Sequence, residues 1–508
     1  MRTPRLACAA IALVVGCDPA PPYRVPSTPR PAGARYKEAY GTWKVASPAD
    51  TIPRGAWWTM FREPELDALE ARLDFSNQTI RVAFHNYMAA RAQIRAAQSQ
   101  YAPVVTADPA VTWFRRSGTF AGVTTTSGAP TTGLSAGTTG TSAGVGGGRI
   151  VSYSLPLEAS WVPDLFGRVK NAVRRSQYQA QLSAADLEST RLLAQTQLAE
   201  VYFQIRGQDA LIQVLEGVVA TYTEIVALTR SRFQQGLDTE ATYVESQLTL
   251  ETARVQLTTA AILRAQYEHA IATLLGVPAT SFSLPRRALI AQPPAIPTGT
   301  PSELLERRPD IAAAERQMAS ANAAIGIARA AYFPVLTLTG NAGLLSSSLD
   351  QLFTWPSRVW SVGAALAETL FDGGRRSAIV DQTMATYDAT VAAYRQTVLV
   401  AFQQVEDFLA QTRILAEARE QQRAVVAFAQ KALALTRDRY TNGIDPYVNV
   451  MIQQTALLAA EQTLVNLEVQ HMTGAVLLVQ ALGGGWDRSQ LPTEAEVSRP
   501  ARARESVR

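Results

Sequence analysis

Three kinds of side chain in this sequence of 508 residues could carry chemistry: a serine at the spacing of a hydrolase nucleophile, three histidines and two cysteines. Ser142 lies in a Gly-Thr-Ser-Ala-Gly pentapeptide that begins at Gly140, and this matches the spacing of a nucleophile elbow. That motif requires a strand, a sharp turn and a helix. Residues 117–147 are instead dominated by Gly, Thr and Ser, which indicates a long exposed loop. We therefore attribute the match to chance.

The three histidines offer no better site. His85, His269 and His471 are far apart in the sequence, and none begins the His-Glu-x-x-His pattern of a zinc protease. His269 falls on an apolar helical seam, where a packed polar side chain is a better interpretation than a metal ligand. The carboxylates are spaced like solvated helix faces, and no Lys follows a Gly as in a phosphate-binding loop. We expect a protein that is not an enzyme and that binds neither a cofactor nor a metal ion.

The cysteines indicate covalent modification instead. Two Arg near the N-terminus precede an apolar run that ends at Gly16, and residues 14–17 read Val-Val-Gly-Cys, which resembles a lipobox. We predict a signal peptide over residues 1–16, cleavage before Cys17 and a covalent lipid on the Cys17 sulfur. The alternative is an ordinary signal peptide that happens to contain a cysteine. Because Cys8 is removed with the signal peptide, the mature chain has no disulfide.

The composition limits the remaining function classes. The formal net charge of +4 is too small and too scattered to indicate nucleic acid as a partner. No stretch of the mature chain reaches the roughly 18 apolar residues of a membrane-spanning helix, so a membrane crossing would require a closed β-barrel. Residues 17–56 are rich in Pro and small residues and are expected to form a lipid-anchored extended tether. We expect residues 487–508 to be a disordered tail.

An internal repeat organises most of the mature sequence. Residues 228–238 read Leu-Thr-Arg-Ser-Arg-Phe-Gln-Gln-Gly-Leu-Asp, and residues 435–445 read Leu-Thr-Arg-Asp-Arg-Tyr-Thr-Asn-Gly-Ile-Asp, at an offset of 207. The offset still holds where the dipeptide Leu-Gly recurs at 275–276 and 482–483. Each copy has a helical period, a break at Gly and a second helical period. Each is therefore expected to form a helical hairpin with a defined tip.

The repeat sets the domain boundaries that we predict. Apolar residues from Leu198 to Phe233 recur at the three- and four-residue spacings of coiled-coil packing. A helix from about Phe166 to Phe233 would be roughly 100 Å long. The predicted parts are a first structural repeat at 57–275, with a strand hairpin at 104–161 and a helical tip at 231–240; a linker or equatorial segment at 276–302; and a second structural repeat at 303–486, with a strand hairpin at 334–370 and a helical tip at 438–447.

The strand hairpins carry a period of two. Apolar side chains from Val151 to Trp161 alternate with Ser, Pro and Glu, which suits a strand between lipid and an aqueous lumen. The same alternation marks residues 104–114, 335–344 and 360–366. Four strands cannot close a barrel with a lumen, because small barrels need about eight. The barrel must therefore be shared between chains, and a trimer would supply twelve strands.

Several motifs occur together along the mature chain. They are Trp57-Trp58-x-x-Phe61 with Pro64 and Leu66; Trp161 to Arg168; Leu304 to Ile311, Ala314-Glu315, Asn322 and Ile325-Gly326; Ala330 to Pro334; Leu370 to Arg375; and Ala481 to Trp486. In this combination the chain resembles the TolC-like outer-membrane efflux proteins. It is most similar in pattern to their NodT-type lipoprotein branch, which serves resistance-nodulation-division pumps. The resemblance covers most of the mature chain, and its specificity lies in the combination of motifs.

The resemblance implies a mainly α-helical protein with a membrane β-barrel part. The expected assembly is a homotrimeric tube in which twelve shared β-strands, four from each chain, form the barrel. Twelve helices would form a periplasmic α-barrel with a mixed equatorial belt. The tube would be a passive exit duct, lipid-anchored in the outer membrane of a Gram-negative bacterium. Small molecules such as drugs or toxic compounds would reach it from an inner-membrane resistance-nodulation-division pump through a periplasmic membrane-fusion adaptor.

The resemblance also implies two sets of site residues. The adaptor-docking positions at the helical tips are Arg232, Phe233, Gly236, Leu237, Arg439, Tyr440, Gly443 and Ile444. The periplasmic aperture positions are Asp445, Val448, Asn449 and Ile452. Relatives commonly carry an acidic residue near position 452, so Ile here favours an apolar constriction over an acidic ring. Asp445 could contribute one carboxylate per chain, or it could be a turn residue before the following helix.

Two other functions remain open. Within the same class, the chain could be the outer-membrane outlet of a type I protein secretion system. From a different class, it could be a trimeric coiled-coil surface adhesin or scaffold. The lipobox and the Trp57-Trp58 pair favour the efflux duct over secretion. A coiled-coil scaffold would leave the alternating strands unexplained.

Overall fold

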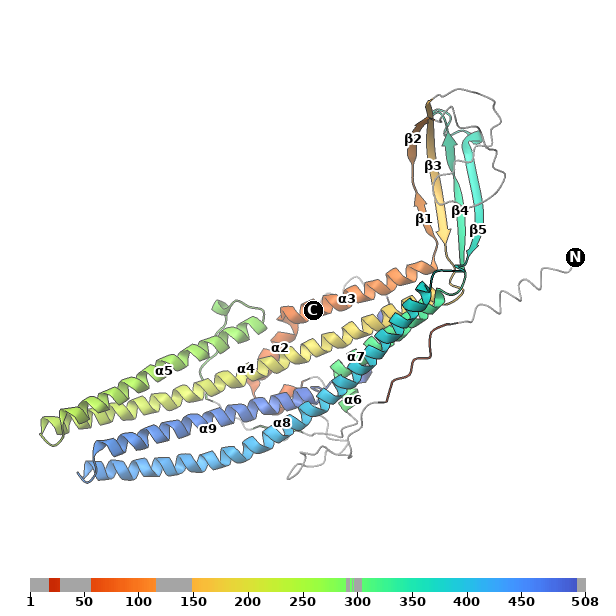
Figure 1. Cartoon of the computed structure of the whole chain (residues 1–508). Coiled ribbons are helices and arrows are strands. Elements are labelled where there is room, and N and C mark those ends of the chain that lie inside the picture. Colours follow the sequence, from red (N-terminus) through yellow and green to blue (C-terminus); the bar gives the residue numbers. More distant parts are fainter. Residues whose placement is uncertain are drawn as a thin grey trace. The chain divides into compact units, whose positions relative to one another are not determined.

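Figure 1 shows a computed structural model of the whole chain, in which residues 18–27, 56–115, 149–288, 293–294, 296 and 304–499 are described. The chain divides into two compact units. The strand unit combines Met1–Ala20, Ala96–Ala172 and Gly326–Val380, and the helical unit combines Pro21–Arg95, Val173–Ile325 and Asp381–Arg508. The predicted signal peptide and Cys17 lie outside the described residues, so lipidation stays a prediction.

The strand unit contains one antiparallel sheet (Figure 1). Its strands are β1 (Val104–Ala107), β2 (Ala110–Arg115), β3 (Arg149–Trp161), β4 (Val335–Ser346) and β5 (Arg358–Ala367). β1 and β2 both pair with β3, β3 pairs with β4, and β4 pairs with β5. Since β1 and β2 pair with successive parts of the same neighbour, they act as one interrupted strand. The two predicted strand hairpins are confirmed, and the β3–β4 pairing joins them into one sheet.

The helices repeat in length, as the internal repeat predicts. α4 (Arg168–Gln234) and α8 (Arg375–Thr441) have 67 residues each, and α5 (Glu240–Leu274) and α9 (Tyr447–Ala481) have 35 each. At 1.5 Å per residue the longer pair measures roughly 100 Å. The shorter helices are η1 (Trp57–Phe61), α2 (Pro64–Ser76), α3 (Gln78–Gln98), η2 (Ser99–Tyr101), η3 (Ala279–Ser281), α6 (Leu304–Arg307), α7 (Pro309–Ala330), η4 (Trp355–Ser357), η5 (Arg488–Gln490) and α10 (Glu494–Ser498).

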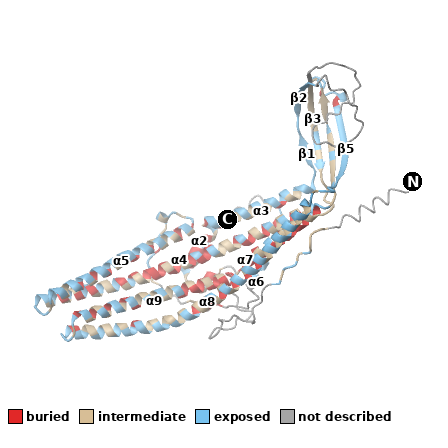
Figure 2. Cartoon of the chain, viewed as in Figure 1, coloured by how far each residue is buried: buried red, intermediate tan, exposed pale blue. Residues whose placement is uncertain are grey.

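The core of the helical unit forms around the middle of α4. Leu198, Phe203 and Ile205 are fully buried, and they belong to one apolar cluster with Trp57 of η1 and Leu66 of α2. Figure 2 shows the buried positions concentrated on α4 and α9, with much of α5 and α8 exposed. Each large apolar side chain buried in this way stabilises the fold by about 1.5–3 kcal/mol relative to leaving it in water. The Trp57 motif therefore has a packing role in this unit.

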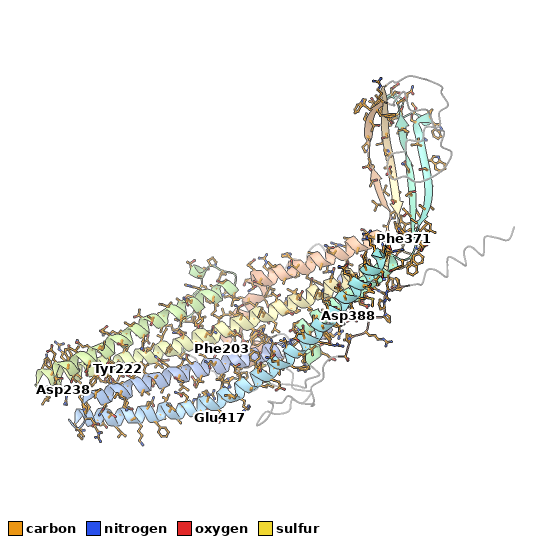
Figure 3. All side chains as sticks on the ribbon, viewed as in Figure 1. Phe203, Tyr222, Asp238, Phe371, Asp388 and Glu417 are labelled. Atoms are coloured by element: carbon orange, nitrogen blue, oxygen red, sulfur yellow. The ribbon has the colours of Figure 1, made fainter. Side chains whose placement is uncertain are left out.

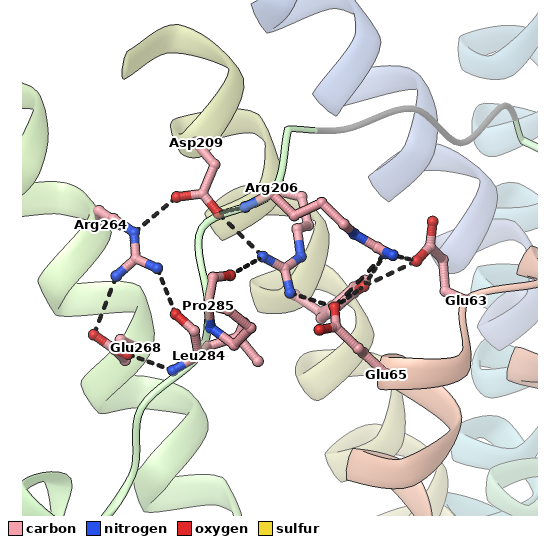
Figure 4. A network of polar contacts seen from close by, with 10 residues as sticks. Glu63, Glu65, Arg206, Asp209, Arg264, Glu268, Leu284 and Pro285 are labelled. Carbon is pink, nitrogen blue, oxygen red and sulfur yellow. Dashed lines mark hydrogen bonds and ion pairs between the residues drawn. The ribbon is translucent and has the colours of Figure 1, made fainter. Parts of the chain in front are cut away.

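A buried ion-pair network fixes the segment that follows α5 (Figure 4). The Asp209 carboxylate on α4 accepts hydrogen bonds from Arg206 at 3.1 Å and from Arg264 of α5 at 2.7 Å. The same two guanidinium groups donate to the backbone carbonyls of Pro285 and Leu284, both at 2.7 Å. Arg206 also binds a carboxylate near the start of α2. The network thus joins α2, α4, α5 and the linker within the helical unit.

The C-terminal segment corrects one prediction. We predicted a disordered tail over 487–508, but residues 487–499 are described and fold into η5 and α10. Thr493 and Glu496 form a capping box that starts α10. Val497 is buried against Ile94 of α3, and this apolar contact offsets the entropy cost of ordering the segment.

The N-terminal segment adds detail to the predicted extended tether over 17–56, of which residues 18–27 and 56 are described. Residues 18–27 are described, and they contact folded elements. In the helical unit the Tyr23 hydroxyl donates to the Glu315 carboxylate at 2.8 Å. In the strand unit the Asp18 carboxylate accepts from the Asn171 amide at 2.8 Å. Residues 18–27 have no helix or strand, as an extended tether requires, and side-chain hydrogen bonds hold them against the folded elements.

One described helix, α4, is long and apolar enough to cross a membrane by length and composition. The relevant window of 18 residues has a mean hydropathy of 1.5, and 22% of it is buried within the chain. This window includes polar residues, so it differs from an uninterrupted run of about 18 apolar residues. A single such helix is weak evidence for a membrane span, since core helices of soluble proteins have the same composition.

Candidate functional site

Both helical tips end in the same backbone motif. Gly236 and Gly443 each have φ +73°, and the N–H of each donates to a carbonyl three residues earlier. The following N–H groups, of Leu237 and Ile444, donate to carbonyls five residues earlier at 2.9 and 2.8 Å. This is a Schellman motif, which requires a residue that adopts positive φ without steric cost. The predicted helix-ending role of the two Gly is confirmed.

Asp238 joins the two tips within one chain. Its carboxylate accepts a hydrogen bond from Arg232 Nε at 2.7 Å and another from the Tyr440 hydroxyl at 2.7 Å. The Arg232 guanidinium also lies over the Tyr440 ring, 4.9 Å from its centroid, as a cation–π contact. Burial and the bond to Asp238 raise the pKa of the Tyr440 hydroxyl above its usual range. That hydroxyl therefore keeps its proton and remains a donor.

Asp238 is not among the predicted site residues, although the repeat carries a signal for it. An Asp stands six residues after an Arg in both copies of the repeat. The turn brings these two positions together, and the second pair, Arg439 and Asp445, also bonds at 2.7 Å. Figure 3 labels Asp238 at the end of the helical hairpin. An Arg and an Asp that recur six residues apart, on either side of a turn in both copies of the repeat, therefore predict an ion pair.

The structure separates the predicted docking residues into two groups. Exposed at the tips are Phe233, Gly236, Leu237, Arg439, Gly443 and Ile444. Tyr440 is buried between the tips, so its prediction as a docking residue is wrong. Its ring packs with Ile225, Tyr447 and Val450, and its hydroxyl is used by Asp238. Arg232 is largely covered for the same reason.

The predicted aperture residues lie at the start of α9. Val448 and Ile452, one helical turn apart, are exposed, and Asn449 is half-buried. The Asp445 side chain makes no capping bond, because the residue that caps α9 is Pro446. Its carboxylate instead accepts from Arg439 at 2.7 and 3.2 Å. Asp445 is therefore a turn residue just before α9, as one of the two alternatives has it, and its carboxylate pairs with Arg439 across the turn without capping the helix.

The sheet has a mainly apolar face and a mainly polar face; the exceptions include Phe114, Leu345 and Val359 on the polar face and Arg115 and Arg358 on the apolar face. Residues directly opposite in an antiparallel pair point to the same face, so the register assigns every side chain. One row reads Leu157, Ala342 and Trp360, and the adjacent row on the other face reads Glu158, Asn341 and Ser361. Other apolar-face residues are Val105, Val111, Trp113, Tyr153, Leu155, Leu338, Leu344, Val362 and Leu366; other polar-face residues are Thr106, Thr112, Ser152, Ser154, Ser160, Thr337 and Thr339. The predicted alternation is confirmed.

Titratable residues are spread along the described helices. The part of the chain that the structure describes contains no group of three His, Cys, Asp or Glu side chains placed to hold a metal ion. Figure 3 shows Asp388 and Glu417 well separated along α8. His269 is exposed, so its predicted packing is wrong. His471 on α9 is the buried histidine, and burial beside Arg419 lowers its pKa to about 4.

Comparisons with known proteins agree with this geometry. The family model described as outer membrane efflux protein matches residues 72–277 and 300–484. The chain is 32% identical over 503 residues to the probable efflux pump outer membrane protein SepC of Pseudomonas putida, covering 98% of this chain and 100% of that protein. It is 30% identical over 497 residues to the outer membrane protein OprJ of Pseudomonas aeruginosa, covering 96% and 98%.

A solved structure shows the same fold. The outer-membrane channel OprN superimposes with a TM-score of 0.79 at 28% identity, covering 92% of this chain and all of that chain. The likeness thus includes both the strand unit and the helical unit. From these matches, the chain belongs to the outer membrane efflux protein family and is the outer-membrane channel component of an efflux system.

Proposed function

We propose that the protein is a homotrimeric exit duct spanning the outer membrane. The observation that carries this proposal is the sheet, with a mainly apolar face, a mainly polar face and unpaired outer edges at β1/β2 and β5 in the described chain. Backbone groups at such edges cannot be satisfied by lipid, so a membrane sheet must close on itself. Three copies supply twelve strand positions, which is enough for a barrel with a lumen.

The duct itself is passive in this proposal. An inner-membrane resistance-nodulation-division pump supplies the energy, and a periplasmic membrane-fusion adaptor connects pump and duct. The exposed tip residues Phe233, Leu237 and Ile444 support such a docking role, because apolar side chains in water at a helix end favour a protein partner. The exposed ion pair of Arg439 and Asp445 adds a polar group beside them. The lipid on Cys17 is part of the proposal and anchors the duct.

The proposed cargo is small toxic molecules. Similar proteins are named for toluene efflux, solvent efflux and antibiotic efflux. The polar face of the sheet offers Ser, Thr and Asn side chains in rows along the described strands. A hydrated wall of this kind supports passage of many compounds, and selection then belongs to the pump.

Bulky substitution at the tips tests the docking role. A first side-chain carbon added to Gly236 or Gly443 would have no atom within 4 Å, so a large residue there meets open space. We expect Gly236→Trp with Gly443→Trp to abolish efflux in cells, while single-channel conductance in planar bilayers is retained. The matched control is Ala at both positions, which imposes the same positive-φ strain without the bulk and should keep efflux. Efflux that survives the Trp variant, or fails equally with Ala, would contradict docking at the tips.

Assembly is tested independently of docking. Chemical crosslinking of the purified protein in mild detergent should stop at three chains. A stable monomer, a dimer or a hexamer would overturn the proposed barrel. Palmitate labelling that persists in a Cys17→Ser variant would contradict the lipid on Cys17, but it would not contradict the proposed trimer.

A further inference from the structure

A cavity lies between α4 and α9 in the helical unit, and we call it the α4/α9 cavity. Its volume is about 560 Å³, within the range of about 300–1,000 Å³ that is usual for small-molecule sites. One wall is a face of α4 around Gly217, and the other is a face of α9 around Leu458. Tyr222, which also lines the cavity, lies between the core residue Phe203 and the tip residue Asp238 (Figure 3). The cavity is therefore separate from the helical tips and from the central core.

Gly217 provides part of the space in this cavity. It lies inside α4, where Gly is less favourable than Ala, and its equivalent in the second repeat is Ala424. A first side-chain carbon on Gly217 would have no atom within 4 Å, so no other part of the described chain packs against this position. Its φ is not positive, and a larger residue would therefore meet no backbone strain. The helix thus carries an open position where a side chain would be expected.

One polar side chain in the cavity wall is buried without a hydrogen bond. Gln454 is 2% exposed, and neither Nε2 nor Oε1 of its amide has a partner in the described part of the chain. Its equivalent in the first repeat, Gln247, donates to the Tyr243 hydroxyl at 3.1 Å, but the residue equivalent to Tyr243 is Val450. A buried amide without partners is costly, because it has lost its hydrogen bonds to water. A molecule bound in the cavity could supply the missing partners.

The cavity also contains a carboxylate that no cation neutralises. Glu461 lies two turns after Gln454 on the same face of α9. Its carboxylate accepts a hydrogen bond from Gln430 at 3.4 Å and forms no ion pair with the described residues. On the opposite wall, burial raises the pKa of the Tyr222 hydroxyl to about 12, and Tyr447 and the Glu461 carboxylate add to the rise. The polar groups of the cavity are therefore one negative charge, one neutral amide and one protonated phenol.

We propose that the α4/α9 cavity binds a small amphipathic organic cation. Its positive N–H group lies at the Glu461 carboxylate, where the attraction is stronger than in open water because the surrounding walls are largely apolar. A second N–H of the same molecule donates to the Gln454 amide oxygen, and the Tyr222 ring adds a cation–π contact. The apolar body of the ligand packs against Val214 and Val218.

The charge of the cavity decides between classes of ligand. An anion would be repelled by Glu461, and a neutral apolar molecule would leave the carboxylate and the Gln454 amide without partners. A cation with an apolar body satisfies the charge and the apolar walls together. The inference goes beyond the proposed duct, which is passive and has no binding site of its own.

Equilibrium dialysis of the purified full chain in mild detergent tests the site. 9-Aminoacridine is a cation at pH 7.5, and acridine has the same ring system without the charge, so the two probes form a matched pair. After uptake by detergent alone is subtracted, we expect saturable binding of 9-aminoacridine and at least about tenfold weaker binding of acridine. Equal binding of the two probes would overturn the proposal, and so would an absence of 9-aminoacridine binding, which would mean that the cavity holds only water.

Removal of the charge locates the bound cation. Glu461→Gln should weaken 9-aminoacridine binding by about tenfold or more and leave acridine binding unchanged, because only the charge is lost. The matched control is Glu468→Gln, two turns further along α9, where the carboxylate pairs with Arg423 at 3.2 Å and does not line the cavity. This control should bind 9-aminoacridine as the unmodified protein does. An equal loss in the two variants would overturn the site.

Filling the cavity provides a second, independent variant. Gly217→Leu places a side chain in the open space and should abolish 9-aminoacridine binding, with an unfolding midpoint no lower than that of the unmodified protein because Leu is the better helix former. Gly217→Ala adds one carbon and should retain binding. Binding that survives Gly217→Leu would place the cation elsewhere and contradict the proposal. Because neither pump nor adaptor is present, a negative result leaves the proposed duct standing, and a failed docking test leaves the cavity site standing.

Discussion

At the scale of single residues, burial decides which polar groups the fold can hold without a partner. His471 is buried on α9, its Nδ1 has no hydrogen-bond partner in the described part of the chain, and Arg419 lies nearby. Burial and that cation lower the histidine's pKa from 6.5 to about 4. The folded state therefore holds the neutral imidazole, whereas the unfolded chain binds a proton at a higher pH.

This pKa shift predicts an acid-sensitive stability. Above pH 6.5 the imidazole is neutral in both states, so its protonation does not change the free energy of unfolding. Between pH 6.5 and about 4 the unfolded chain binds a proton that the folded chain does not, so the free energy of unfolding falls. His471→Leu should flatten this fall. The measurement is the thermal unfolding midpoint at pH 7.5 and at pH 4.5 for both proteins. An equal loss in the two proteins would mean that other groups cause the acid sensitivity.

Asp209 illustrates the opposite case, a buried charge that is fully paired. It lies between Arg206 and Arg264, and all three side chains are largely covered. Asp209→Ala would leave two buried cations without their shared carboxylate and should destabilise the helical unit by about 3–5 kcal/mol. Glu216→Ala is the matched control, because its pair with Arg286 at 3.5 Å is exposed and is worth about 0–1 kcal/mol. Denaturant unfolding checks both values, and similar losses would show that the network adds no stability.

At the scale of elements, glycines in one backbone motif have different neighbours. Gly276 and Gly483 end α5 and α9 with positive φ, as Gly236 and Gly443 end α4 and α8. A first side-chain carbon on Gly276 or Gly483 would meet a backbone carbonyl oxygen, that of Ser76 or of Arg307, well inside contact distance. At the two tip glycines it would meet nothing within 4 Å.

Alanine substitution should separate these two pairs. At Gly236 or Gly443 the cost is the left-handed conformation, about 1–2 kcal/mol and confined to the tip. At Gly276 or Gly483 the backbone must also move, so the unfolding midpoint should fall much further. Thermal unfolding of the four single variants checks the order. Equal midpoints would indicate that the helix ends at 276 and 483 have room to shift.

The strand faces and the helical tips could be predicted from the sequence, whereas contacts between distant segments could not. The alternation of apolar and polar residues predicts which side chains of β3, β4 and β5 share a face, because successive side chains of a strand point to opposite faces. The repeat placed both tips, because a Gly with positive φ is a local requirement. The β3–β4 pairing joins segments far apart in the chain, and the burial of Tyr440 depends on Asp238 in the other hairpin. Such contacts depend on tertiary arrangement, which local periodicity does not encode.

At the scale of the whole molecule, the described chain leaves backbone edges and apolar side chains without partners of its own. Its sheet has open edges, its helical hairpins form an open row, and its exposed apolar side chains recur on α5, α8 and α9. Repetition of the chain around an axis is the simplest way to cover all of them. In the proposed duct, the start of α9 is the place where we expect equivalent helices from three copies to approach one another. Val448 and Ile452 are exposed there without a partner in the described chain, which is consistent with residues that narrow a shared opening.

Smaller side chains at the start of α9 should widen the predicted periplasmic aperture. Replacing Val448, Asn449 and Ile452 with Ala removes apolar and polar bulk from each copy, so the opening should widen. Single-channel conductance in planar bilayers should rise, and cells carrying the variant should admit vancomycin. The matched control conserves size with Val448→Ile, Asn449→Gln and Ile452→Leu, and its conductance should match the unmodified protein. Because Asp445 is already paired with Arg439, Asp445→Asn should change conductance less than the triple Ala variant. An intact trimer with unchanged conductance in the Ala variant would place the constriction elsewhere along the duct.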